Sequence, residues 1–480
     1  MKKALSLGWF LLIILTIHAQ HKECIRDFNT IVHRIQYDYP GYADKVNDKN
    51  LHELKALEQT VRKKIKACPD SCKTYMDSYV SWFKDKHLRI SVNRQAKRST
   101  ASSSPKKYYP VEPEKLTNPS QGLEGIWTGF WGKLAIIKQD TNHYTGIALD
   151  YRGYDKHQVI FEGKACNDSL FFLTTYWNFR KFNPHQETAS LQLNHQVLEI
   201  HDYTRLVRQT DDPAFDQALL SSYIPCFPNG LNTYPVALSL SDSTFYLRIP
   251  TFYSDLTEQL VTKHWDEIMG RPNLIIDIRN NSGGQDYYYD KLAELIYTGP
   301  YESKNVEWYA SRGLIKDLED NIKQGHIKEG FEQQAEDLLA RMKTNVGGFV
   351  LHPYAEGDSI IIRDTIYPYP RKAGIILNEN NASSAEQFLL TAQHSRKVIT
   401  FGAQNTAGIL DYSNITPKEL PSGKYHLWLP ATRSGRLPEN PIDNTGIAPE
   451  VKIPLEPEIQ LYDRLDQWVY FVQRYLEAYH

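Results

Sequence analysis

The chain has 480 residues, and its 55 lysine and arginine residues against 57 aspartate and glutamate residues give a formal net charge of −2 at pH 7. This balance argues against an electrostatic nucleic-acid interface. A content of 41% hydrophobic and 12% aromatic residues is typical of folded domains rather than of disorder, and the length predicts two or more domains.

Residues 1–20 are typical of a secretory signal peptide. Lys2 and Lys3 precede an apolar run from Ala4 to Ile17, and the segment His18–Gln20 supplies a small residue for cleavage. The apolar run is short for a membrane-spanning helix, and no later segment is long and apolar enough to cross a bilayer. We therefore expect an exported bacterial protein, periplasmic or extracellular, without stable membrane insertion after signal removal.

Residues 21–96 have a helical pattern, with helices expected near 24–38, 50–67 and 70–86. Residues 97–119 are rich in Ser, Lys and Pro and predict a linker. Three of the five cysteines lie in the helical region, where a pair among them is expected to oxidise in an exported protein. The odd count leaves at least one thiol free or paired elsewhere. The cysteines are Cys24, Cys68, Cys72, Cys166 and Cys226.

Residues 120–212 change to short alternating runs separated by turns. The alternation is clearest in Gly125–Trp131 and Lys133–Ile137. This pattern predicts a small antiparallel β barrel or sandwich. The region shows no chemical constellation, so we expect a structural or ligand-presenting role.

Residues 213–480 alternate between apolar runs and helical patterns, which predicts an α/β catalytic domain. Strands are expected at 244–249, 274–278, 373–377 and 398–401, and helices at 257–269, 286–297 and 384–393. Residues 311–343, rich in Lys, Glu and Gln, predict an inserted helical pair.

Two polar turns follow two of these predicted strands. Asn280–Gly284 ends in two glycines, and Asn380–Glu386 carries Ser383 at a strand-to-helix junction. Such a junction is how an acyl-transfer hydrolase exposes a nucleophile beside backbone N–H donors. The alternative is structural, because Ser383 and Glu386 also have the spacing of a helix capping box.

Three motifs in this order carry a resemblance to a known family: Asp277–Gly284, Ala382–Glu386, and Gly402–Gly408 followed by Gly446–Glu450. Over its last 240 or so residues the chain resembles the tail-specific (C-terminal-processing) serine proteases, in their tricorn-like and retinoid-binding-protein-like branch. The resemblance implies a catalytic domain of the ClpP/crotonase-like type and peptide or protein substrates. The β-rich middle does not match the PDZ module of many members.

The resemblance also implies roles for individual residues. Ser383 stands at the nucleophile's position. The adjacent Ser384 is the residue that could be mistaken for it. The N–H of Ser384 and that of Gly283 or Gly284 are expected to form the oxyanion hole, because glycine lets the backbone approach the substrate. Asp277 and Arg279 are expected to be a structural pair beside the glycines.

The expected base departs from the better-known bacterial branch. Its lysine position falls on Gly408, and no lysine stands nearby. The segment Asp85-Lys86-His87 resembles the Asp-Gly-His motif of the tricorn-like branch, so His87 is the candidate general base. Asp443 stands where that branch carries a glutamate and is the candidate orienting acid, with Glu386 as the alternative.

The sequence therefore predicts an exported serine endopeptidase that forms an acyl-enzyme on Ser383. Two alternatives stay open. One is a non-catalytic ligand- or peptide-binding protein on the same fold, and the other is an esterase. No His/Cys cluster has metal-site spacing, so no metal and no other cofactor is expected.

Overall fold

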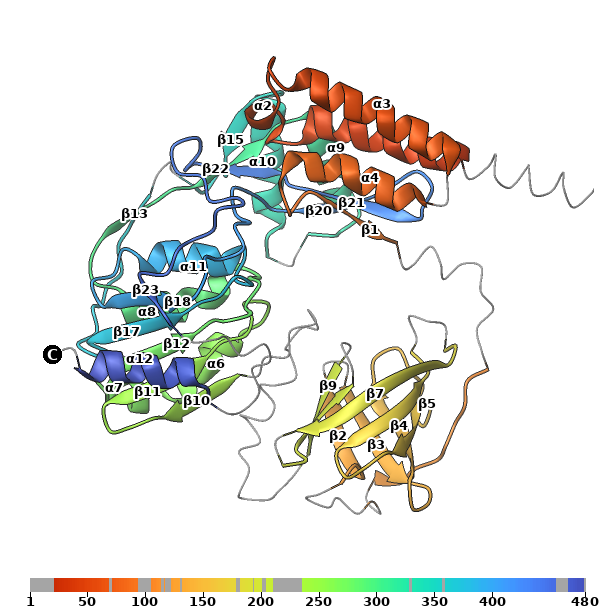
Figure 1. Cartoon of the computed structure of the whole chain (residues 1–480), viewed down its shortest axis with the longest axis vertical. Coiled ribbons are helices and arrows are strands. Elements are labelled where there is room, and N and C mark those ends of the chain that lie inside the picture. Colours follow the sequence, from red (N-terminus) through yellow and green to blue (C-terminus); the bar gives the residue numbers. More distant parts are fainter. Residues whose placement is uncertain are drawn as a thin grey trace, which may run out of the picture. The chain divides into compact units, whose positions relative to one another are not determined.

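The structure is a computed structural model. It describes residues 21–68, 71–93, 105–113, 116, 122–129, 132–177, 182–192, 194–200, 204–209, 235–327, 330–355, 359–454 and 465–478. The predicted signal peptide, part of the predicted linker and the predicted boundary near residue 212 lie outside these ranges. The chain folds as two compact units, whose elements are labelled in Figure 1. The first unit is Met1–Lys97, Pro300–Ile362 and Gly408–Gly446, and the second is Arg98–Gly299, Arg363–Ala407 and Ile447–His480.

The first unit contains seven of the helices that the structure describes and three small sheets. Its helices are residues 21–38, α2 (Tyr42–Lys45), α3 (Leu51–Ala67), α4 (Cys72–Val80), η2 (Ser81–Phe83), α9 (Arg312–Lys323) and α10 (Glu332–Lys343). One sheet has the order β1 (Arg89–Val92), β21 (Tyr425–Leu429), β20 (Thr416–Glu419). A second has the order β15 (Phe349–Leu351), β14 (Val306–Tyr309), β22 (Thr432–Ser434), β19 (Tyr412–Ser413), and β13 (Tyr301–Ser303) pairs with β16 (Ser359–Ile361).

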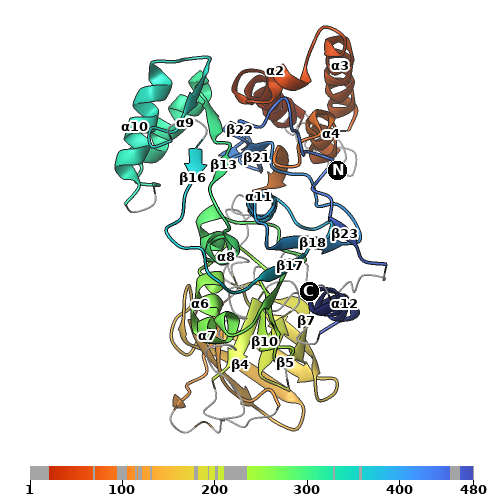
Figure 2. The ribbon, with the colours of Figure 1, turned by 90° about the vertical axis from the view of Figure 1, so that its left-hand side faces the viewer.

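The predicted inserted helical pair is present as α9 and α10, which pack side by side (Figure 2). Leu314 and Met342 of this pair share one apolar core with Phe28 and Ile31 of the first helix. Sequence reasoning had assigned residues 300–362 and 408–446 to the catalytic domain, whereas both segments fold with the N-terminal helices. The difference arises because the chain leaves the α/β sheet twice and returns, and no residue pattern marks these crossings.

A disulfide joins Cys24 of the first helix to Cys72 of α4, with 5.9 Å between their Cα atoms. This confirms the expected pair within the N-terminal helical region. Cys68 and Cys166 are exposed free thiols, and Cys226 lies outside the described residues. The disulfide fixes the two helices that flank α3.

The β-rich region of the second unit is a closed antiparallel barrel, so of the two expected architectures the barrel is the one that forms. It consists of β2 (Gly125–Gly129), β3 (Gly132–Lys138), β4 (His143–Tyr151), β5 (Val159–Ala165), β6 (Leu170–Thr175), β7 (His185–Gln192), β8 (Val197–Ile200) and β9 (Thr204–Arg208). Pairing of β2 with β9 closes it. The guanidinium of Arg208 stacks over Trp127 at 4.3 Å and donates to the carbonyls of Glu124 and His195, which ties the last strand to the first.

The rest of the second unit is a six-stranded sheet flanked by helices. The strand order is β10 (Val236–Ser239), β11 (Thr244–Arg248), β12 (Asn273–Asp277), β17 (Lys372–Ile376), β18 (Val398–Gly402), β23 (Val451–Lys452). The strands from β11 to β23 run parallel, and β10 is antiparallel. The helices are α6 (Leu256–Lys263), α7 (Trp265–Met269), η6 (Asp286–Tyr289), α8 (Asp290–Ile296), α11 (Ser384–Ala392) and α12 (Gln467–Ala478).

Helices cover both faces of this sheet, which explains why β11 and β12 are buried along their whole length. Trp468 and Val472 of α12 pack on Ile275 and Ile376. The predicted helix at 257–269 forms as two helices, α6 and α7, that break at His264. Among the helices that the structure describes, none has both the length and the apolar character needed to cross a membrane.

The parallel arrangement determines where the polar turns lie. Strands β11, β12, β17 and β18 are consecutive neighbours, so their carboxyl ends meet at one edge of the sheet. The turn Asn280–Gly284 follows β12, and the turn Asn380–Glu386 follows β17. Ligands of parallel α/β sheets bind at this edge. The two predicted turns are therefore neighbours at the position where such a fold places its chemistry.

Candidate active site

Ser383 lies in a strained turn between β17 and α11. Its backbone has φ 56° and ψ −124°, a conformation that residues with a side chain rarely adopt. Such strain costs on the order of 1–3 kcal/mol and persists only where the surrounding structure imposes it, often at active sites. We call Asn380–Glu386 the serine turn. A sharp strand-to-helix turn of this kind presents a serine hydroxyl at the sheet edge.

Ser384 differs from Ser383 in burial and in bonding. Ser383 is partly exposed, whereas Ser384 is only 5% exposed. The Ser384 hydroxyl also forms a hydrogen bond with the carboxyl group of Asp286. The structure therefore favours Ser383 as the serine that a substrate could reach.

The glycine turn, Asn280–Gly284, contacts the serine turn directly. A Cβ atom on Gly283 would lie 2.6 Å from the Ala382 carbonyl oxygen and 2.8 Å from the Ser384 nitrogen. Gly283 also has φ +96°, which a residue with a side chain adopts only under strain. The close approach of the two turns therefore depends on glycine at this position.

The predicted oxyanion donors are not equivalent. The N–H of Gly283 donates to the Asn281 side chain at 2.9 Å, so this donor is engaged. Phe252 pairs with the turn through the Gly283 carbonyl and the Gln285 N–H. Within the described residues no acceptor contacts the N–H of Gly284 or of Ser384, the first residue of α11. These two amides are the ones available to an oxyanion.

A network of buried asparagines joins the two turns. Asn378 Nδ2 donates to Asn280 Oδ1 at 2.8 Å, and Asn280 N–H donates back to Asn378 Oδ1 at 3.0 Å. Asn381 Nδ2 donates to the carbonyl of Asn281 at 3.1 Å. Asn281 Nδ2 in turn donates to the Ile249 carbonyl after β11. Because buried amides are costly to leave unpaired, this network opposes relaxation of the strained serine turn.

Asp277 and Arg279 form the structural pair that the sequence predicts. Arg279 donates to both carboxylate oxygens of Asp277, at 2.9 and 2.6 Å, and Tyr246 donates at 2.7 Å. Burial alone would raise the pKa of Asp277, but the Arg279 guanidinium outweighs it and lowers the pKa to about 2. The ion pair anchors the start of the glycine turn.

Glu386 connects the serine turn to the third motif. It is fully buried, and its carboxylate accepts the Ser383 N–H at 3.2 Å and the hydroxyl of Thr406. Thr406 Oγ1 accepts the N–H of Ile447 at 2.7 Å. Glu386 thus supplies half of a capping box and holds three motif segments together. These contacts support a structural role for it.

His87 lies in the first unit, in a segment between η2 and β1 that we call the histidine turn, Lys84–His87. Its Nδ1 lies 2.6 Å from the carbonyl oxygen of Tyr412. A carbonyl only accepts hydrogen bonds, so Nδ1 carries a proton and the lone pair of a neutral ring is on Nε2. Asp85 holds the same turn, because it accepts the His87 N–H at 2.8 Å and the Tyr39 hydroxyl at 2.7 Å. The side chain is in the tautomer that a general base needs.

Asp443 also lies in the first unit. Its Oδ1 accepts the N–H groups of Leu410 and Asp411, each at 2.9 Å, and within the described residues Oδ2 has no hydrogen-bond partner. Burial, reinforced by the charge of Asp85, raises the pKa of Asp443 to about 7. The group that bonds His87 Nδ1 is the Tyr412 carbonyl, so orientation of the imidazole by Asp443 stays a prediction.

Sequence reasoning missed Tyr412 because its contribution comes from a backbone carbonyl, which any residue type provides. It also missed Asn281, whose side chain decides which glycine amide is free. In the part of the chain that the structure describes, no three His, Cys, Asp or Glu side chains are grouped so that they could hold a metal ion.

The comparisons with known proteins agree with the motifs. Residues 243–453 match the model of peptidase family S41, a range that contains Ser383 and Asp443 but not His87. No curated protein matches the chain significantly.

Three solved structures align with this chain over most of its length. Mature CPAF complexed with lactacystin is 14% identical, with 91% of this chain and 94% of that chain covered and a TM-score of 0.44. The photosystem II D1 C-terminal processing protease is 13% identical, with 90% and 93% covered and a TM-score of 0.35. The tricorn protease is 11% identical, with 95% and 37% covered and a TM-score of 0.38. At these TM-scores the likeness decides nothing about mechanism or substrate.

The family match thus agrees with the order and spacing of the three motifs and with the turns that they form at the sheet edge. The chain carries a domain of peptidase family S41 and is a serine peptidase, as its resemblance to the tail-specific proteases predicts.

Proposed function

We propose that the protein is an exported endopeptidase that cleaves peptide or protein substrates through an acyl-enzyme on Ser383. The observation that carries the proposal is the strained Ser383 turn, packed against the glycine turn and flanked by the free amides of Gly284 and Ser384. An activated serine beside preorganised N–H donors is the arrangement that acyl transfer requires.

In the proposed reaction, Ser383 Oγ attacks the substrate carbonyl and its proton passes to Nε2 of His87. The amides of Gly284 and Ser384 stabilise the oxyanion, and the Asn281-bound Gly283 supports their placement. The carbon–nitrogen bond then breaks, and His87 returns the proton to the leaving amine. Water, deprotonated by His87, attacks the ester and releases Ser383. The mechanism requires His87 of the first unit to reach Ser383 of the second.

We assign the supporting acid to Asp443. An ionised Asp443 would stabilise the imidazolium that forms on His87, whose Nδ1 is already oriented by the Tyr412 carbonyl. Because the pKa of Asp443 is raised to about 7, this support should grow as the pH rises through neutrality. Glu386 is the alternative acid, but its carboxylate is occupied by the Ser383 N–H and Thr406.

We further propose that the protein is located in a periplasmic or extracellular compartment and that its catalytic domain has a fold of the ClpP/crotonase-like type. The Cys24–Cys72 disulfide supports export to a periplasmic or extracellular compartment, because disulfides persist in oxidising compartments. The parallel sheet, followed after β17 by the helix α11 that begins beside Ser383, supports assignment of the catalytic domain to the ClpP/crotonase-like fold type.

The proposal is tested with purified mature protein and a library of internally quenched peptides, with cleavage sites read by mass spectrometry. The expected result is internal cleavage by the wild type and by Ser384→Ala, and none by Ser383→Ala. If the wild type released no more product than Ser383→Ala, the endopeptidase assignment would be wrong. A parallel panel of esters measures any preference for ester over peptide bonds.

A further inference from the structure

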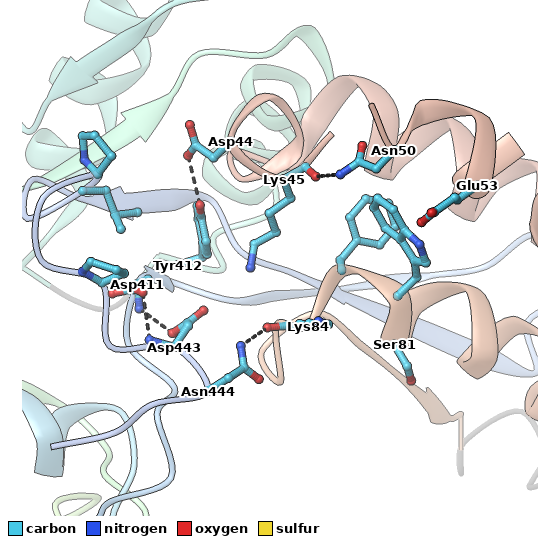
Figure 3. Close-up of a pocket in the computed structure, with 15 residues that line it drawn as sticks. Asp44, Lys45, Asn50, Glu53, Ser81, Lys84, Asp411, Tyr412, Asp443 and Asn444 are labelled. Atoms are coloured by element: carbon cyan, nitrogen blue, oxygen red, sulfur yellow. Dashed lines mark hydrogen bonds between the residues drawn. The ribbon is translucent and has the colours of Figure 1, made fainter. Parts of the chain in front are cut away.

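The first unit contains a pocket of about 670 Å³, which is shown in Figure 3. This size lies within the range of small-molecule sites. Its apolar lining residues are Trp82, Phe83, Leu437, Pro438 and Pro441. Its polar lining includes Lys45, Glu53, Asp443 and Asn444. A lining of apolar side chains with a few polar groups is typical of a site for an amphipathic ligand.

Lys45 brings a cation into this pocket without a matching anion. Its ammonium group lies 4.8 Å from the centre of the Tyr412 ring, and Figure 3 shows it pointing toward Asp443 and Asn444. Among the described residues no carboxylate lies within ion-pair distance of it. Three other acids line the pocket. Glu53 is an exposed residue of α3, and the other two are engaged elsewhere. Asp44 accepts the Tyr412 hydroxyl at 2.9 Å, and Asp411 pairs with Arg436 at 3.3 Å.

Asp443 provides the second polar group. Its Oδ2 is buried and has no hydrogen-bond partner in the described part of the chain. The charged groups that face it are the carboxylates of Asp85 and Asp411 and the ammonium of Lys45, and the hydroxyls of Tyr39 and Tyr412 lie near. Burial and the charge of Asp85 raise its pKa to about 7, so below that pH Asp443 is protonated and can donate a hydrogen bond.

We propose that this pocket binds a small carboxylate that has an apolar or aromatic body. The carboxylate head pairs with the Lys45 ammonium and accepts a hydrogen bond from protonated Asp443. The body packs on apolar lining side chains such as Trp82 and Pro438. An anion fits better than a cation beside Lys45, because among the described residues its ammonium has no anionic partner within ion-pair distance, while Asp443 is neutral in acid. The site shares Tyr412 and the proposed supporting acid Asp443 with the proposed catalytic residues, but ligand binding to it needs no peptidase activity.

The test is isothermal titration of the mature protein with 4-phenylbutyrate and, as the uncharged control, 4-phenylbutyramide. The acid should bind saturably and the amide roughly tenfold or more weakly, because a hydrogen bond to a charged group contributes about one such factor. Lys45→Met should weaken binding of the acid by a similar factor, whereas Lys45→Arg should retain it. Lys49→Met, a nearby exposed lysine outside the pocket, should bind like the wild type.

The pH dependence provides a second measurement. The acid should bind more tightly at pH 6 than at pH 8, because ionisation of Asp443 removes a donor and adds repulsion. Asp443→Asn should bind with little change between these pH values. Equal affinity for acid and amide, unchanged binding by Lys45→Met, or no saturable binding at millimolar concentration would each overturn the proposal.

Discussion

The serine turn and the histidine turn are held by different kinds of contact. The serine turn begins four residues after the end of the parallel strand β17, and its neighbour across the sheet edge is the glycine turn. Buried asparagines join the two turns, so Ser383 is held in a strained conformation by the sheet topology itself. The histidine turn follows a short 3₁₀ helix, and it is held by Tyr39 and by the carbonyl of Tyr412, more than 300 residues away in sequence.

The nucleophile and its proposed base therefore depend on separate parts of the fold. The serine turn relies on one continuous sheet and on the Asp277–Arg279 ion pair beneath it. The histidine turn relies on three chain segments assembling into the first unit, which the Cys24–Cys72 disulfide helps to hold. Changes to one set of contacts should therefore leave the other set intact.

The largest effect is expected from the serine turn itself. Ser383→Ala should lower kcat/KM for a cleaved peptide on the order of 10⁴-fold or more, because the acyl-enzyme cannot form. Ser384→Ala is the matched control, and it should retain most of the activity because its backbone N–H remains. Steady-state kinetics on both variants decides the matter, and equal losses in the two would contradict the assignment of Ser383.

The corresponding change in the histidine turn should be smaller. His87→Ala should lower kcat/KM by about 10²–10⁴-fold, the usual contribution of a general base, while KM changes little. His52→Ala, an exposed histidine of α3 in the same unit, serves as the control. Full activity in the His87 variant would remove it as the base and leave the serine turn unaffected.

The ion pair of Asp277 and Arg279 at the start of the glycine turn can be broken without changing Ser383 or His87. Asp277→Asn should destabilise the protein by about 3–5 kcal/mol, because it leaves the buried Arg248 without its anion and leaves Arg279 paired with Asp466 alone. Asp290→Asn, which breaks an exposed pair with Arg363, should cost less than about 1 kcal/mol. Urea unfolding monitored by circular dichroism measures both values.

Removal of the Cys24–Cys72 disulfide should lower the stability of the first unit, as loss of Asp277 should lower that of the second. The double variant Cys24→Ser, Cys72→Ser opens a cross-link between residues 48 apart in sequence and should cost about 2–4 kcal/mol of stability. Cys68→Ser, at an exposed free thiol, should cost close to nothing. Hydrogen exchange should show the loss in the helices that the disulfide joins. A loss confined to the α/β sheet would contradict the independence of the two units.

The smallest expected effect is a loss of folding stability at low pH. The pKa of Asp277 in the folded state, about 2, lies below the ordinary value of 3.8 for this group, so its ionised form stabilises the fold. This contribution, about 2 kcal/mol, is complete above the unfolded-state pKa and is lost as the pH falls from 4 toward 2. Unfolding titrations across this range should show the loss in the wild type and little of it in Asp277→Asn.

Features carried by consecutive residues could be predicted from the sequence. The strand before Asn280, the strand-to-helix junction at Ser383 and the helical pair near 311–343 each have a local pattern, and each forms close to its expected bounds. The Asp277–Arg279 pair was predictable for a similar reason, since two charges beside a buried strand must neutralise each other.

Features that depend on distant contacts could not be predicted. The choice between barrel and sandwich depends on the pairing of β2 with β9, which no local pattern reveals. The free amide is that of Gly284, because the Asn281 side chain accepts the N–H of Gly283. The sequence alone does not indicate which of the two glycine amides this side chain binds. The Tyr412 carbonyl that holds His87 leaves no residue-type signal at all.

The most direct test of the central claim is labelling of the mature protein with a fluorophosphonate, followed by intact-mass and peptide mass spectrometry. The account predicts one adduct per chain, located on Ser383, present in Ser384→Ala, absent from Ser383→Ala and strongly slowed in His87→Ala. An adduct on Ser384, or labelling that persists in Ser383→Ala, would contradict it.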